Sequence, residues 1–217
     1  MKFFSYESKF SQLLLKICYA CYLNVLWFLC SIPIFTIGAS TTALYYASLK
    51  IVRGEECYVG PQFFRSFREN FKQATAIWMI LLGIGVFLGA DGYVLYHLRQ
   101  NSTGSMAVIW TLILALVIAA GIVLVIVLIH IFPLLASVSN TNRAMLKNSF
   151  LIGTHYLFAT ILVFAVHFAM FFAIVAVFTP LLIFGEGLCA LISAWLLNHI
   201  LISVSGDPEE PVEDEDL

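Results

Sequence analysis

The chain has 217 residues, of which 61% are hydrophobic and only 11% are charged, and its formal net charge is −2. Soluble domains carry about 25% charged residues, so this composition excludes a water-soluble globular domain and predicts an integral membrane protein. The charge balance has no basic excess, so no nucleic acid partner is expected.

Long apolar runs without regular alternation of apolar and polar residues predict an all-α fold, because transmembrane barrel strands require that alternation. A helix needs about 20 residues to cross a bilayer core of about 30 Å. We expect a polytopic transmembrane helix bundle of about five to six membrane segments, in a single domain over residues 1–205. The predicted segments are 11–30, 41–53, 74–97, 105–136, 156–182 and 187–204.

The first apolar region is too long for one crossing, and its sequence is interrupted. Pro33 disfavours helical structure in the residue before it, and Gly38 permits a tight reversal. Ser40, Thr41 and Thr42 follow, and their side chains suit the N-cap of a new helix. We therefore predict a helical hairpin whose second helix is short for a full crossing.

The basic residues support this hairpin, because short loops rich in Lys and Arg stay in the cytoplasm. With a reversal at the interruption, ten of the eleven basic residues lie on one side and only Arg99 lies on the other. We expect a multi-pass protein with both termini in the cytoplasm. A cleaved signal peptide is the rival interpretation, but both the basic segment and the apolar run are longer than such peptides have.

Two short segments predict amphipathic helices on the cytoplasmic side. In 61–73, four phenylalanines fall on one helical face and basic residues occupy the rest, which suits a helix lying in the lipid headgroups of the inner leaflet. This predicted lipid or partner interface consists of Phe63, Phe64, Arg65, Phe67, Arg68, Phe71 and Lys72. Docking of a soluble partner is the alternative to the lipid bilayer. Residues 141–152 form a weaker example.

A few polar residues in the apolar segments are candidates for a binding site. A half-helix that begins near residue 40 would direct its free N–H groups and positive dipole end into the membrane, as in transporters of polar solutes. The candidate polar site consists of Asn24, Ser40, Thr41, Thr42 and Asp91. An ordinary turn of a helical hairpin is the alternative interpretation.

Two other ionisable residues lie in or beside the apolar segments. Glu186 is expected to be a solvated residue of a glycine-flanked turn, and His167, near mid-span, needs a hydrogen-bond partner.

The small residues of Gly85-x-x-x-Gly89 favour close helix packing, either within the bundle or between copies in a homo-oligomer.

Signs of catalysis are missing from the sequence. Cys18 and Cys21 form a C-x-x-C pair, but it lies in an apolar helical run without a second cysteine or histidine pair, so we expect no metal or other cofactor. Common nucleotide-binding, metalloprotease and hydrolase motifs are also missing, so we expect no enzyme activity. Residues 206–217 are rich in acidic residues and predict a disordered tail.

The interrupted region also carries a family resemblance. The segment from Asn24 to Ala39 contains N-x-x-W followed by P-x-x-T-x-G, and it resembles the hallmark segment of YesL-type bacterial membrane proteins. The resemblance continues through 42–46, 53–55, 63–73, 132–136 and 146–150, and it covers about 3–205.

The resemblance implies a bacterial cytoplasmic membrane protein from a family without an established activity. Genes of this family often stand beside sugar ABC transporter genes. The resemblance therefore implies an accessory role in carbohydrate uptake, with sugar ABC transporter subunits as partners. A small-solute transporter with a binding site near residues 31–42 is the alternative.

Overall fold

The computed structural model of the chain describes residues 9–55, 58–176, 181 and 185–205. Over these ranges the regular structure is entirely helical, which confirms the predicted fold class. The helices are α1 (Lys9–Ser31), η1 (Ile34–Thr36), α2 (Ile37–Val52), α3 (Val59–Gln100), α4 (Ser105–Ser137), α5 (Asn142–His155), α6 (Leu157–Ala176) and α7 (Gly185–Ser205). The predicted acidic tail, 206–217, lies outside the described residues.

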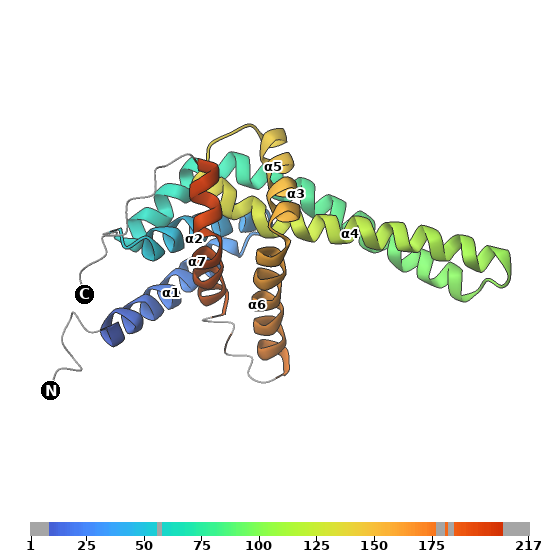
Figure 1. The fold of residues 1–217 in the computed structure, drawn as a ribbon, viewed down its shortest axis with the longest axis horizontal. Helices are drawn as coiled ribbons and strands as arrows, with labels where there is room; N and C mark the ends of the chain where they lie inside the picture. The colour runs from blue at the N-terminus through green and yellow to red at the C-terminus, as the bar shows by residue number, and fades with distance from the viewer. Residues whose placement is uncertain (1–8, 56–57, 177–180, 182–184, 206–217) are drawn as a thin grey trace.

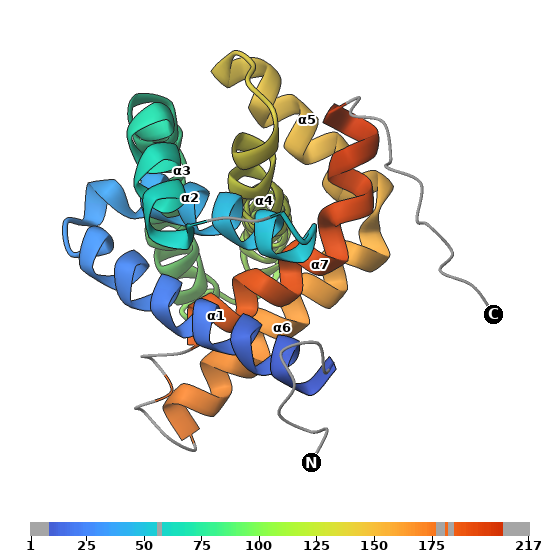
Figure 2. The ribbon, with the colours of Figure 1, turned by 90° about the vertical axis from the view of Figure 1, so that its left-hand side faces the viewer.

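Five of these helices are long and apolar enough to cross a membrane, namely α1, α3, α4, α6 and α7. The short helix α2 has another role. Its 16 residues extend about 24 Å, and most of them are buried. It contacts α1, α3, α4 and α7 (Figure 2). The second predicted segment is therefore the centre of the bundle.

The interruption after α1 differs from the prediction in one respect. α2 begins at Ile37, so Ser40, Thr41 and Thr42 lie inside the helix and do not cap it. The hydroxyl of Ser40 donates to the Thr36 carbonyl and that of Thr42 to the Gly38 carbonyl. The N–H groups around these residues already bond within the helix, so the hydroxyls donate to the carbonyl four residues back.

Thr36 closes the interruption instead. Its Oγ1 lies 2.6 Å from the carbonyl oxygens of both Cys30 and Pro33. The indole Nε1 of Trp78, on α3, donates to the Ile34 carbonyl at 2.8 Å. These bonds satisfy carbonyls that the break between α1 and α2 removes from regular helical pairing.

The predicted division between an interfacial helix at 61–73 and a membrane segment at 74–97 is wrong. Both belong to α3, which runs without interruption for 42 residues, because neither glycine nor proline occurs between Pro61 and Gly83. Phe63 is fully buried, and Phe67 and Phe71 pack against the core. The phenylalanine face is therefore turned to the bundle and not to lipid.

The other predicted amphipathic helix, 141–152, corresponds to α5. Its apolar residues Met145 and Ile152 are buried, and α5 packs against α4. This face also belongs to the protein interior. α5 ends at His155, and α6 starts two residues later at Leu157.

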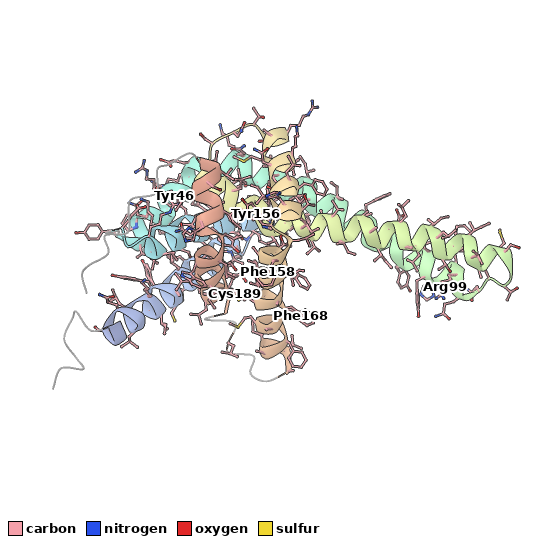
Figure 3. All side chains as sticks on the ribbon, in the orientation of Figure 1. Tyr46, Arg99, Tyr156, Phe158, Phe168 and Cys189 are labelled. Atoms are coloured by element: carbon pink, nitrogen blue, oxygen red, sulfur yellow. The ribbon has the colours of Figure 1, made fainter. Side chains whose placement is uncertain are left out.

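The distal halves of α3 and α4 form a hairpin that we call the arm, residues 82–126. The two helices leave the rest of the bundle side by side (Figure 1). No residue of the arm is buried. The α3 part, 82–100, is about 28 Å long, close to the thickness of a bilayer core. Arg99 lies near its tip (Figure 3), where its Nε donates to Thr111 Oγ1 at 3.0 Å.

α7 crosses α1 with the two backbones in direct contact. A Cβ atom at Gly187 would lie 2.1 Å from the Ala20 carbonyl oxygen and 2.9 Å from Cβ of Asn24. No L-residue with a side chain fits without displacement of one helix. The crossing therefore requires glycine at this position.

We expect the Gly187→Ala variant to be less stable by about 1–3 kcal/mol, because an inserted methyl group must push the two helices apart. The measurement is the thermal unfolding midpoint in detergent. The matched control is Gly83→Ala, since a Cβ at Gly83 meets no atom within 4 Å and alanine favours a helix. Equal midpoints for the two variants would contradict the crossing.

Candidate functional site

A pocket that is apolar over most of its surface but holds four polar side chains lies between α2, α4, α6 and α7, and we call it the polar pocket. Its volume is about 230 Å³. α4 supplies an apolar wall, while the other three helices supply polar side chains. The lining residues are Thr41, Tyr45, Val125, Leu128, Ile129, Phe132, His167 and Glu186.

Glu186 and His167 face each other in this pocket. Glu186 lies in the first turn of α7, and its Oε1 is 3.8 Å from Nε2 of His167. The two side chains are 29% and 31% exposed, respectively. The expectation that Glu186 is a solvated turn residue is therefore wrong, since the glycines on either side are buried helical residues that allow close packing.

The orientation of the His167 ring follows from its second nitrogen. Nδ1 lies 2.9 Å from the Val163 carbonyl oxygen. A carbonyl only accepts hydrogen bonds, so Nδ1 carries the hydrogen. In the neutral ring, Nε2 then presents a lone pair toward Glu186. With Glu186 ionised and His167 neutral, imidazole and carboxylate both face the gap as acceptors.

Two residues of α2 complete the polar side. Tyr45 is 4% exposed. Thr41 Oγ1 accepts a hydrogen bond of 3.1 Å from Nε1 of Trp27, on α1. This bond joins α1 to α2 and fixes the Thr41 side chain at the edge of the pocket.

Asn24 positions the first turn of α7 from outside the pocket. Its Oδ1 accepts a hydrogen bond of 2.8 Å from the Gly187 N–H. Gly187 is the third residue of α7, and the first N–H groups of a helix have no partner within it. Asn24 thus caps α7 across 163 residues of sequence and holds the residue next to Glu186.

The structure brings together part of the predicted polar site. Thr41 lines the pocket. Asn24 does not line it but bonds to Gly187, the residue that follows the pocket residue Glu186. Ser40 and Thr42 are buried, and their hydroxyls donate to the carbonyls of Thr36 and Gly38. Asp91 lies on the arm, about 15 Å along the helix from Leu81, the last buried residue of α3.

Sequence reasoning missed the grouping of Tyr45, His167 and Glu186. A usable signal was present, because His167 is the ionisable residue of α6 and Glu186 is the acidic residue of α7, and these two apolar helices are adjacent in sequence. Within the described ranges, no group of three or more His, Cys, Asp or Glu side chains is placed to hold a metal ion.

The basic face of α3 is a second candidate surface. Phe64, Arg65, Arg68 and Lys72 are exposed. Nε of Arg65 donates to Oε1 of Glu69 at 2.9 Å. Four of the seven predicted interface residues therefore remain available, and Phe63, Phe67 and Phe71 do not.

Comparison with known proteins gives one match. Residues 20–92 match the model of a family described as "Protein of unknown function, DUF624". No curated protein and no solved structure matches the chain. The matched part contains Asn24, Thr41 and Tyr45 but ends before His167 and Glu186. About a third of the chain is thus similar to a family whose function is unknown. The resemblance to YesL-type proteins also implied a family without an established activity, but the description of the matched family does not name YesL.

We expect Asn24→Ala to lower stability by about 0.5–2 kcal/mol, as loss of a helix cap does. Unfolding of the purified protein in detergent measures this change. The matched control is Asn101→Ala, an exposed asparagine at the end of α3 whose backbone N–H makes the capping bond. A cost confined to Asn24 supports the capping role, and equal effects at the two positions argue against it.

Proposed function

We propose that the chain is a non-enzymatic integral membrane protein that assists carbohydrate uptake in bacteria by contacting subunits of a sugar ABC transporter. The arm carries this proposal. It exposes two long apolar helices that the rest of the chain does not cover (Figure 1).

The arm has the surface of a helix-packing site. A Cβ atom at Gly83, Gly89 or Gly121 would meet no neighbouring heavy atom within 4 Å. Gly85, in contrast, approaches Leu124 of α4 and serves the packing of the arm itself. In lipid, small residues allow helices of a partner to approach closely, and dispersion contacts then stabilise the pair. The open glycines therefore favour a partner with transmembrane helices.

The class of partner comes from the resemblance to YesL-type proteins, whose gene context is sugar uptake. The family matched over residues 20–92 has no known activity, so it is compatible with this role and with others. A permease subunit supplies several transmembrane helices in the same bilayer, which suits the length and apolar character of the arm.

The location that we propose is the bacterial cytoplasmic membrane, with both termini in the cytoplasm. The exposed basic residues of α3, Arg65, Arg68 and Lys72, then face the inner leaflet. Anionic lipid contributes about 1 kcal/mol for each nearby Lys or Arg. This attraction would fix the depth of the bundle at its cytoplasmic end.

Small-solute transport is a second candidate function. The polar pocket supports it, because Thr41 beside the helix interruption lines a cavity that also holds His167 and Glu186. Uptake by the purified protein alone in proteoliposomes would favour transport over an accessory role.

To test the accessory role, we expect sugar ABC permease subunits to co-purify with the full chain from native membranes in mild detergent. Gly89→Ile and Gly121→Ile should each reduce the recovered permease by roughly tenfold, equivalent to about 1.4 kcal/mol of lost packing. Ala169→Ile is the matched control, an exposed small residue on α6, outside the arm. Quantitative mass spectrometry of the eluates measures recovery.

Two outcomes would count against the accessory role. One is recovery of the chain without permease subunits. The other is equal recovery from the arm variants and from Ala169→Ile. Co-purification of differently tagged copies, lost in the glycine variants, would assign the arm to a homo-oligomer instead.

The topology is tested with reporters fused after residues 36, 58, 101, 145 and 185. We expect cytoplasmic activity at 58 and 145 and external activity at 36, 101 and 185, because basic residues concentrate in the segments next to 58 and 145. External activity at 58 would mean that α1, the interruption and α2 together cross the membrane once.

A further inference from the structure

We propose that the polar pocket binds an organic ammonium ion between the Glu186 carboxylate and the His167 imidazole. This inference does not rest on the accessory role, since the pocket belongs to the bundle and the permease contact to the arm.

An ammonium group can supply hydrogens to both groups when the carboxyl is ionised and the ring is neutral. Nδ1 of His167 donates to Val163, so Nε2 of the neutral ring faces Glu186 Oε1 without a hydrogen. The separation of 3.8 Å is too long for a direct hydrogen bond. A group with several N–H donors between the two residues can bond to both at once, as an ammonium does.

Among the described residues, His167 is the one basic side chain within ion-pair distance of the Glu186 carboxylate. In the part of the chain that the structure describes, Lys50 pairs with Glu55 and Arg65 pairs with Glu69, and only His167 stands near Glu186. An ionised carboxylate among apolar helices is costly unless a positive charge is close. A bound cation would remove this cost.

The remaining walls favour an organic cation. The rings of Tyr45 and Phe132 line the same cavity, and aromatic rings attract ammonium groups. Val125, Leu128 and Ile129 form an apolar wall that suits an alkyl group. The volume of about 230 Å³ is many times the roughly 10–15 Å³ of cavity that one water molecule needs. The pocket therefore fits a small amine with a short apolar body.

A primary ammonium reaches the pocket from either of two sources. One is a free alkylamine, and the other is the headgroup of an aminophospholipid. Both present the same charged donor to Glu186. They can be distinguished, because added aminophospholipid competes with an alkylamine for the site only if the headgroup is the natural ligand.

The test is calorimetric titration of the full-length protein in dodecyl maltoside, a detergent without nitrogen, using butylammonium chloride as the probe. We expect saturable heat with butylammonium and none with 1-butanol, which has a similar shape but no charge. Glu186→Gln should weaken binding at least tenfold. Glu69→Gln, an exposed glutamate on α3, is the matched control and should bind like the unaltered protein.

A second variant keeps the test decisive if Glu186→Gln does not fold. Leu128→Phe retains the carboxylate and fills part of the cavity, and it should also weaken binding.

Phosphatidylethanolamine added to the micelles should compete with butylammonium if the headgroup is the source, and should leave the titration unchanged if a free amine is the source. Either result supports an ammonium site. Equal heats with 1-butanol, unchanged binding by the folded variants, or no saturable heat in the millimolar range would overturn it.

Discussion

The contact between α1 and α7 at Gly187 is the constraint on which the rest of the bundle depends. Lipid provides no hydrophobic force between helices, so their association relies on close packing and on interhelical hydrogen bonds. Gly187 provides the first, because its missing side chain admits the Ala20 carbonyl. Asn24 provides the second by accepting the Gly187 N–H. Loss of a helix cap costs about 0.5–2 kcal/mol, so the two features together favour one crossing point.

That crossing sets the geometry of the polar pocket. Asn24 and Trp27 are three residues apart and therefore lie on one face of α1. The first bonds α7 beside Glu186, and the second bonds Thr41 on α2. One face of α1 thus positions α7 and α2, two of the helices that line the pocket, although α1 itself does not line it. Changes in α1 should alter the distance between Thr41 and Glu186 without touching either residue.

Sequence patterns predicted what depends on local chemistry. They predicted the helical class from apolar composition and the interruption near Pro33 from backbone restrictions. They failed where tertiary packing decides. The amphipathic pattern around Phe63 identifies a buried face but not whether lipid or protein buries it. The glycines beside Glu186 suggest a turn, whereas α7 uses them for helix contact. Asp91 looked like a site residue because a carboxylate in an apolar run is costly, yet it lies on the arm.

α4 connects the two parts of the molecule for which we propose functions. Its residues 105–126 belong to the arm, and its residues Val125, Leu128, Ile129 and Phe132 form the apolar wall of the pocket. Pro133 follows at once and removes one backbone hydrogen bond from the helix, which eases bending there. A ligand against this wall and a partner on the arm therefore act on the same helix. If α4 has two positions that both the ligand and the partner distinguish, binding in the pocket and binding on the arm alter each other's affinity by the same factor.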